Sequence, residues 1–282
     1  MKLGIFAKTF ARESVEEVLD AVQALDLKTL HFNYACAGLP SLPDEIPPGL
    51  PERIGEAARQ RELEIGGVSA TFNLIHPDPA RRAQGLAALD RIGATCRDLR
   101  TRLVTLCTGT RDPDDMWRAH PGNLEPDAWH DLRASLDEAL EIADRHEIVL
   151  GIEPESGNVI DSASKARRLL DEIDSPRLRI VLDPANLVPS HPAKADQDLQ
   201  AMSALIDEAF DLLGSEISMA HAKEFTPQGL DTACAIGRGL LDWERYLSIL
   251  GGSGFKGPLI MHGFHESCAG ASMRFLRNIL ES

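Results

Sequence analysis

Four residues with metal-binding side chains stand at the ends of four short apolar segments in the second half of the sequence. These residues are Glu153 after VLGI, Asp183 after LRIVL, His221 after EISMA and His262 after GPLIM. Two carboxylates and two imidazoles that meet at one place form a suitable ligand set for a divalent cation. The mixed oxygen and nitrogen donors suit Mn, Co, Fe or Zn, and the second imidazole makes Mg a less favoured candidate. The spacing therefore predicts one divalent metal centre, provided that the four segments are neighbouring strands.

The elements that must bring these residues together alternate regularly along the chain. Short apolar segments predict strands at residues 3–7, 29–33, 64–70, 102–107, 148–153, 178–183, 217–222 and 258–263. Amphipathic segments predict helices near residues 14–25, 50–60, 79–97, 128–146, 162–173, 198–213, 242–250 and 270–281. This alternation favours parallel strands covered by helices, and eight repeats favour a closed (β/α)8 TIM barrel. We expect an α/β protein with a single such domain over residues 1–282, and catalytic residues at the carboxyl ends of its strands.

Local signals support several of the predicted helix starts. Ser14 and Glu17 have the spacing of a capping box ahead of an apolar periodic run. Ser162 and Asp127 are candidate N-cap residues, because each can accept a hydrogen bond from a backbone amide of the first turn.

Composition excludes some classes of partner. With 29 basic and 44 acidic residues the net charge is −15, which repels nucleic acid and anionic membrane surfaces. The five cysteines are scattered without a C-x-x-C pair, which is typical of a reducing compartment. The first apolar run is too short for a signal sequence, and no run approaches the roughly 18 apolar residues of a membrane span. We therefore expect a cytoplasmic protein that binds neither nucleic acid nor membrane.

Several phrases together resemble the xylose-isomerase-like TIM-barrel superfamily, in its branch of sugar phosphate isomerases and epimerases. The phrases are NLIHPDP, TGTRDPDDMW with HPGN, LGIEPESGNVIDS, IVLDPANL, AHAKEF and GPLIMHGF. In that family a Glu, an Asp, a His and a second Glu after strands five to eight bind the metal. By resemblance these roles fall on Glu153, Asp183, His221 and, with a substitution, His262. The resemblance also implies a small carbohydrate substrate. It is compatible with a homo-oligomer but does not fix the oligomeric state.

The substitution at His262 bears directly on the chemistry. In the family's ketose epimerases the two glutamates act as acid and base on opposite faces of the sugar, while the metal stabilises an ene-diolate. A metal-bound imidazole nitrogen has no lone pair left for a proton, so a second base would be missing. Reactions that need only one base therefore stay open as candidates. Alternatively, His262 stays unligated and transfers a proton beside Glu153, or Glu155, His265 or Glu266 supplies the second base.

Further residues are candidates for substrate binding. They are Glu155, Asn186, Lys223, Trp117, His120, Asn123 and His76. Lys223 resembles the family's lysine after the strand-seven histidine, and Trp117 and His120 belong to a long loop that could stack on a sugar and contact its hydroxyls. Each has a plain structural alternative, such as a turn at His76, a loop anchor at Trp117, a cap at Asn186 or a surface ion pair between Lys223 and Glu224.

The sequence thus predicts a divalent-metal-dependent isomerase or epimerase acting on a small keto-sugar or polyol-derived substrate by proton abstraction next to a carbonyl. A dehydratase of the inosose or dehydroshikimate type and a catalytically silent sugar-binding barrel stay open as alternatives. An apurinic endonuclease shares the barrel, but it needs several metals and a basic face, which the charge of −15 disfavours.

Overall fold

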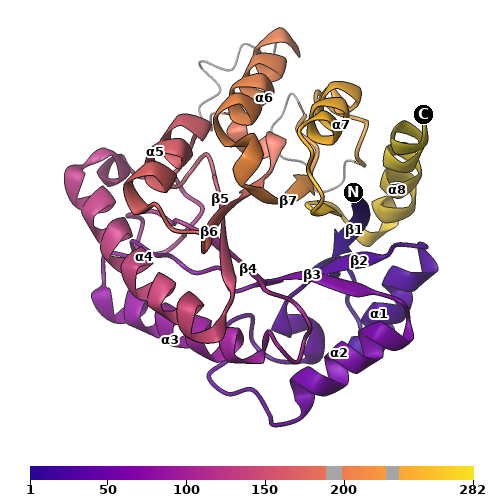
Figure 1. Ribbon diagram of the computed structural model, residues 1–282, viewed down its shortest axis with the longest axis horizontal. Helices are drawn as coiled ribbons and strands as arrows, with labels where there is room; N and C mark the ends of the chain where they lie inside the picture. The colour runs from indigo at the N-terminus through magenta and orange to yellow at the C-terminus, as the bar shows by residue number, and fades with distance from the viewer. Residues whose placement is uncertain (189–198, 227–234) are drawn as a thin grey trace.

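A closed barrel of parallel strands forms the centre of the molecule, and α-helices surround it (Figure 1). The computed structural model describes residues 1–188, 199–226 and 235–282. Within these ranges the strands are β1 (Lys2–Phe6), β2 (Thr29–Phe32), β3 (Glu64–Ser69), β4 (Leu103–Cys107), β5 (Val149–Glu153), β6 (Leu178–Leu182), β7 (Ile217–Ala222) and β8 (Pro258–Met261). The α-helices in the same ranges are α1 (Val15–Ala24), α2 (Leu50–Gln60), α3 (Pro79–Thr95), α4 (Pro126–His146), α5 (Ala163–Ile173), α6 (Leu199–Leu213), α7 (Trp243–Gly252) and α8 (Glu266–Glu281).

The predicted (β/α)8 barrel is confirmed by the pairing of the strands. Each strand pairs in parallel with the next, and β1 closes the barrel against β8 with Gly4 opposite Ile260. The predicted strands overlap the observed ones with ends that differ by at most two residues. Closure places the carboxyl ends of β5, β6, β7 and β8 side by side at one mouth of the barrel.

Capping chemistry explains where several helices begin. The capping box is confirmed, because Ser14 Oγ accepts a hydrogen bond from the Glu17 amide and the Glu17 carboxylate accepts one from the Ser14 amide. Ser162 likewise caps α5 by accepting from the amide of Lys165. The prediction that Asp127 caps α4 is wrong. Glu125 holds the N-cap position there, because Pro126 lacks an N–H and suits the first helical position.

The interior of the barrel is divided into an apolar and a polar part. Leu103, Val181, Met219 and Ile260 form a separate buried apolar cluster. Polar side chains are also buried inside, among them His31 on β2 and Thr105 on β4. The hydrogen bond between His31 Nε2 and Thr105 Oγ1, 3.0 Å long, crosses the interior, since β3 lies between these two strands.

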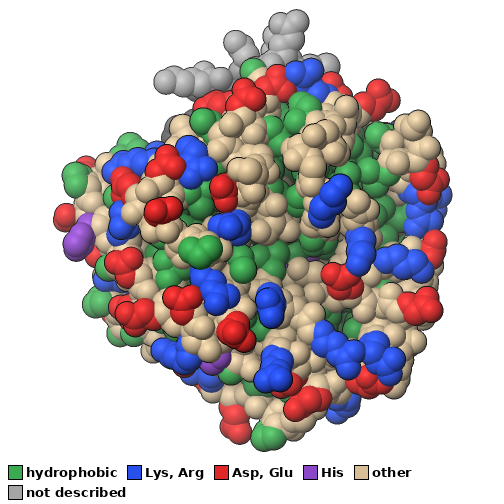
Figure 2. Space-filling model, viewed as in Figure 1, with side chains coloured by type: hydrophobic (Ala, Val, Ile, Leu, Met, Phe, Trp, Pro, Cys, Tyr) green, Lys and Arg blue, Asp and Glu red, His purple; other side chains and the backbone are tan. Residues whose placement is uncertain are grey.

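The surface carries both signs of charge despite the acidic composition. On the face shown in Figure 2, acidic and basic side chains are intermingled. Surface ion pairs such as Arg145 with Asp90, at 2.7 Å, join neighbouring helices. In the described part of the chain, none of the helices has the length and apolar character required to traverse a bilayer.

Candidate metal centre

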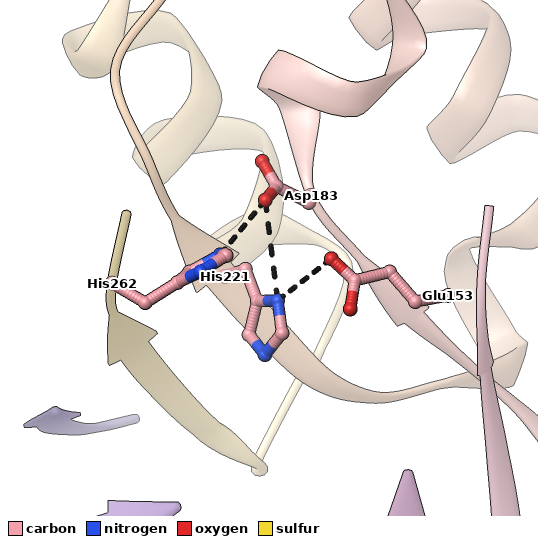
Figure 3. A group of neighbouring side chains, drawn as sticks. All are labelled: Glu153, Asp183, His221 and His262. Atoms are coloured by element: carbon pink, nitrogen blue, oxygen red, sulfur yellow. Dashed lines mark hydrogen bonds and ion pairs between the residues drawn. The ribbon is translucent and has the colours of Figure 1, made fainter. Parts of the chain in front are cut away.

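The four residues singled out at the start of the sequence analysis converge at the mouth of the barrel (Figure 3). Glu153 is the last residue of β5, His221 belongs to β7, and Asp183 and His262 directly follow β6 and β8. One donor atom from each of the four side chains lies within 4.8 Å of the others. The sequence spacing was therefore sufficient to predict this convergence.

Hydrogen bonds and an ion pair show which atoms face each other. His221 Nδ1 lies 3.0 Å from Glu153 Oε1 and 4.0 Å from Asp183 Oδ2. His262 Nε2 lies 2.9 Å from the same Asp183 oxygen. The Asp183 side chain is fully buried, while 16% of the His262 side chain is exposed. His262 is therefore the member of the group nearest to solvent.

Burial and neighbouring charges set the protonation of the group. Burial and the Asp183 carboxylate raise the pKa of Glu153 to about 7. Burial would raise the pKa of Asp183, but the Lys223 ammonium and the bond from His262 hold it below its usual range. Burial lowers the pKa of His221 to about 4, and burial with the nearby His221 ring lowers that of His262. Both rings are therefore neutral near pH 7, the form in which imidazole binds a metal.

These donors fit a divalent cation. Two carboxylate oxygens and two neutral ring nitrogens share a space small enough for one ion to reach all of them. The ionised and fully buried Asp183 supplies negative charge, which the Lys223 ammonium, 3.3 Å from Oδ2, balances in this structure.

A second layer of polar side chains holds the first in place. Asn186 Nδ2 donates to Glu153 Oε1 at 2.8 Å, and Lys223 Nζ donates to Asn186 Oδ1. Lys223 Nζ also lies 3.3 Å from Asp183 Oδ2. The alternative ion pair of Lys223 with Glu224 is wrong, because the Glu224 carboxylate accepts hydrogen bonds from backbone amides and from Trp243 instead. Asn186 and Lys223 thus contact the candidate ligands directly.

Glu155 lies on the same side as Glu153, as the alternation along an extended strand predicts. A carboxylate oxygen of Glu155 lies within 4.8 Å of donor atoms of Glu153 and Cys107. Burial and the charge of Glu153 raise the pKa of Glu155 to about 8. Glu266, the other carboxylate considered as a base, begins α8 and forms an ion pair with Arg12. Glu155 is therefore the additional carboxylate that reaches the centre.

The long loop after β4 is held by three asparagines. Asn73 Nδ2 donates to the Thr110 carbonyl at 2.7 Å, and Asn158 Oδ1 accepts from the Gly109 amide at 2.7 Å. Asn123 Oδ1 accepts from the Arg111 amide at 2.7 Å, and its Nδ2 donates to the carbonyl of Gly157 at 3.0 Å. The side-chain amide of Asn123, which we expected to contact a sugar, is therefore already hydrogen-bonded to backbone groups of the loops.

Gly109 is required where this loop leaves the barrel. Its φ is +77°, a left-handed conformation that favours glycine. A Cβ at this position would come within 2.0 Å of Asn73 Oδ1.

The remaining candidate residues lie at the periphery. The half-buried His76 lies 3.1 Å from the Pro113 carbonyl through Nε2, and Trp117 is 50% exposed. His120 Nδ1 accepts from the Gly122 amide at 3.1 Å. Within residues 1–188, 199–226 and 235–282, no hydrogen bond or ion pair links His76, Trp117 or His120 to the four converging side chains.

A cleft lies beside this loop. It has a volume of about 570 Å³, and its lining includes His120, Asn123, Ser156 and Leu187. Ser156 and Leu187 directly follow Glu155 and Asn186 in the chain, so the cleft borders the strand ends that carry the candidate ligands. The lining of this cleft, in the part of the chain described, does not include Glu153, Asp183, His221 or His262.

His31 was missed by the sequence reasoning. Its ring is only 4% exposed, stacks on Phe6 at 4.6 Å between centroids, and lies 5.8 Å from the His221 ring. The signal was present in the strand segment TLHF, where the histidine alternates with the buried Leu30 and Phe32. Such a histidine in an apolar strand could not be distinguished from an ordinary core residue without its contacts.

The chain is similar to a known protein family and to named sugar epimerases over most of its length. Residues 19–279 match the family model described as xylose isomerase-like TIM barrel. L-ribulose-5-phosphate 3-epimerase UlaE of Shigella flexneri serotype 5b is 26% identical over 197 residues, which cover 70% of this chain and 62% of that protein. The chain thus spans less than two thirds of that epimerase. For UlaE of Escherichia coli K12 the identity is 26% over 280 residues, which cover 94% of this chain and 88% of the relative.

Solved structures share the fold at low sequence identity. L-ribulose 3-epimerase superposes with a TM-score of 0.76 at 16% identity, covering 99% of this chain and 94% of that one. The 3-keto-D-glucoside 4-epimerase YcjR of E. coli gives 0.72 at 17% identity, with both chains fully covered. At these identities the similarities show the barrel fold alone.

Proposed function

The chain belongs to the xylose isomerase-like TIM barrel family, and on that premise we propose that it is a divalent-metal-dependent isomerase or epimerase. Its substrate is a small keto-sugar or polyol-derived molecule, and the reaction is proton transfer at a carbon next to a carbonyl. The observation that carries the proposal is the convergence of Glu153, Asp183, His221 and His262 within 4.8 Å at the mouth of the barrel. The named relatives, which are sugar 3-epimerases, support the choice of substrate class.

The four converging side chains would hold the ion, one of Mn, Co, Zn or Mg. A divalent cation bound there would polarise a substrate carbonyl and lower the energy of negative charge on adjacent oxygens. Asn186 and Lys223 orient the ligands, because their side chains contact Glu153 and Asp183.

Glu153 is the proposed base. Its contacts with Asn186 Nδ2 at 2.8 Å and with His221 Nδ1 at 3.0 Å both involve Oε1. Oε2 is therefore the oxygen available to take a proton from the substrate carbon.

The fate of the proton decides the product. If His262 is a ligand, Glu153 removes the proton from one carbon and returns it to the neighbouring carbon on the same face. A hydroxyl proton passes between the two oxygens, and the net result is an aldose–ketose isomerisation. Return on the opposite face gives epimerisation and needs a second group, for which Glu155 or an unligated His262 is placed.

A dehydratase is the second candidate function. The observation that favours it is His262 at the position of the family's second glutamate, since elimination of water needs a base on one face only. The same Glu153 would remove the proton, and a hydroxyl on the neighbouring carbon would leave as water.

Proton exchange tests the proposal without a guessed product. The protein would be loaded with MnCl2 and incubated in deuterated water with a panel of ketoses and keto-polyols, and the loss of C–H signal followed by NMR. We expect exchange at the carbon next to the carbonyl, falling by roughly 10²–10⁴-fold in Glu153→Gln. Glu172→Gln, a surface change on α5, is the matched control and should exchange normally.

Three outcomes of this experiment distinguish the candidate functions. New sugar signals indicate isomerisation or epimerisation, and loss of a hydroxyl indicates dehydration. Binding without exchange for every substrate would overturn the enzymatic proposal in favour of the silent sugar-binding barrel.

A further inference from the structure

The described part of the loop between β7 and α7 contains two glycines close to a helix start. Gly237 and Gly239 stand a few residues ahead of Trp243, the first residue of α7. Backbone amides of glycine-rich turns near a helix start can bind an anion such as phosphate. In many TIM barrels the phosphate site is built from the loops after strands seven and eight. The contacts of these amides therefore bear on whether the substrate carries a phosphate group.

The anion that this loop binds is the chain's own Glu224. The Gly237 amide donates to Glu224 Oε2 at 2.7 Å, and the Phe225 amide donates to Oε1 at 3.0 Å. Trp243 Nε1 donates to Oε2 at 3.0 Å. Glu224 is only 3% exposed, and a Cβ on Gly239 would come within 2.4 Å of its Oε1. The loop is thus packed around an internal carboxylate, which a phosphate group would have to displace to reach the same donors.

A second carboxylate stands in the loop region after β8. Glu266 is the first residue of α8, where the amides of a helix start favour negative charge. Arg12, from the segment between β1 and α1, donates to both oxygens of this carboxylate, with 2.9 Å between Nη1 and Oε2. The helix start therefore already carries a negative charge, and the guanidinium beside it is already paired.

The arginines of the loop after β4 are paired with acidic side chains as well. Arg111 Nη1 lies 2.7 Å from Asp131 Oδ2. Arg118 Nη1 lies 3.1 Å from Asp112 Oδ2. A guanidinium binds phosphate best when two of its N–H groups are available, and these pairs compete for them. Arg238, between the two glycines of the β7–α7 loop, is exposed and is the exception.

We propose that the substrate is an unphosphorylated keto-sugar, and that Glu224 and Glu266 are specificity-determining residues that disfavour a phosphate ester. Each places a protein carboxylate in one of the loops that bind phosphate in other barrels. A phosphate monoester carries a charge of about −1.5 to −2 near pH 7, so it would be repelled by these carboxylates and would find their donors occupied. This inference rests on the proposed function and narrows its substrate class. It separates two kinds of relative, since UlaE is named for a 5-phosphate and L-ribulose 3-epimerase for a free sugar.

Matched pairs of free and phosphorylated ketoses test the inference. Protein loaded with MnCl2 would be given ribulose, xylulose and tagatose beside their terminal phosphate esters. Exchange of C–H into deuterated water gives kcat/KM for each compound. We expect the free sugar of every active pair to exceed its ester by about 100-fold or more, because like charges brought together at a binding site weaken binding.

Glu266→Gln should change this preference in a way that a merely structural role would not. The substitution frees the Arg12 guanidinium, so we expect kcat/KM for the ester relative to the free sugar to rise about 10-fold, the effect of one charge-assisted hydrogen bond. Arg12→Gln combined with Glu266→Gln should remove the gain. Glu281→Gln, at the other end of α8 and exposed, is the matched control and should keep the wild-type ratio.

Glu224→Gln is a second variant, which removes the buried charge from the β7–α7 loop. It should shift the ratio towards the ester as Glu266→Gln does. Should Glu224→Gln fail to fold, the sugar pairs and Glu266→Gln still decide the inference.

Binding of inorganic phosphate gives a measurement that does not depend on turnover. Calorimetric titration of metal-free wild type should show no saturable binding of phosphate at concentrations up to about 1 mM. Saturable binding that Arg12→Gln or Arg238→Gln abolishes would place a phosphate site at the mouth and overturn the inference. A wild-type preference for a phosphate ester would overturn it too, as would an unchanged ratio in Glu266→Gln. If no sugar of any pair exchanges, the proposed function fails, whereas the phosphate titration still decides whether the mouth rejects the anion.

Discussion

His262 is the residue that most affects the charge and the donor atoms of the centre. Its Nε2 shares Asp183 Oδ2 with the Lys223 ammonium, at 2.9 Å and 3.3 Å respectively. A neutral imidazole in this place brings one negative charge less than a carboxylate would. It also replaces an oxygen donor by a nitrogen, which favours borderline ions such as Zn over hard ions such as Mg.

Changing His262 to Glu should alter this preference for the metal. We expect His262→Glu to lower the ratio of Zn affinity to Mn affinity about 10-fold and to strengthen the binding of Mg, because a third oxygen donor in place of a nitrogen suits harder ions. Competition titrations on metal-free protein measure the ratio. His262→Gln, which offers an oxygen without the charge, is the control for charge. An unchanged ratio in His262→Glu would mean that residue 262 is not a ligand.

The residues that end strands were predictable, and those that depend on tertiary contacts were not. Glu153 and His221 were identified because they follow apolar strand segments, and strand ends meet at one mouth of a barrel. Asn123 was expected to contact the substrate, yet its amide bonds to two loops that only the folded chain brings together. His31 carries no local signal of its contact with Thr105, which lies 74 positions further along the chain.

Among the elements, the loop between β4 and α4 is held in place by a buried asparagine from another loop. Asn158, which follows β5, holds this loop by accepting from the Gly109 amide and by donating to the Met116 carbonyl at 3.0 Å. Its side chain is 2% exposed, so neither bond can be replaced easily by solvent. The loop borders the cleft of about 570 Å³ beside the centre.

Removing the Asn158 side chain should loosen this loop. We expect Asn158→Ala to cost about 1–3 kcal/mol of stability, because two buried backbone groups lose their partners. Hydrogen exchange should accelerate in residues 108–117 more than in the barrel strands. Asn278→Ala on the exposed face of α8 is the matched control, with stability close to that of wild type. Uniform acceleration along the whole chain would instead indicate global destabilisation.

The ends of elements were predictable where the signal is a single local bond. The capping box at Ser14 requires only residues within one turn, and it fixed the start of α1. At α4 two local signals predict different N-cap residues. The helix begins at Pro126, so Glu125 and not Asp127 is the N-cap. At α8 the helix begins at Glu266, four residues before the predicted start, and the Arg12 side chain that binds Glu266 comes from the opposite end of the sequence.

At the scale of the whole molecule, the barrel and a metal ion should stabilise each other. The candidate ligands lie on four different strand ends, so an ion that binds them all restrains the mouth of the folded barrel. An ion that binds only the folded state stabilises it by about 2.7 kcal/mol when present at 100 times its Kd.

Removal of metal should therefore lower the melting temperature. We expect addition of MnCl2 at 100 times its Kd to chelated protein to raise Tm by several degrees, as for domains of this size. Differential scanning calorimetry measures the shift. Asp183→Asn should lose most of it, because the ionised ligand in the group is removed. An equal shift in Asp183→Asn and wild type would place the bound ion elsewhere on the molecule.

The barrel could be predicted as a whole because its pattern repeats along the chain. Alternation of strands and helices gave the architecture, but the register of the strands did not follow from it. The shift in pairing between Leu30 and His31 depends on which neighbours pack inside the closed barrel, a contact that no local segment contains.

The pairing of β1 with β8 also has a consequence for synthesis on the ribosome. Lys2–Phe6 is translated about 250 residues before its partner Pro258–Met261, so this edge of β1 stays open until β8 has been made. Of the four converging residues, His262 emerges last, immediately after that same strand. The complete ligand set therefore cannot form until β8 and His262 have been translated, so loading of the ion follows the synthesis of the other three ligands.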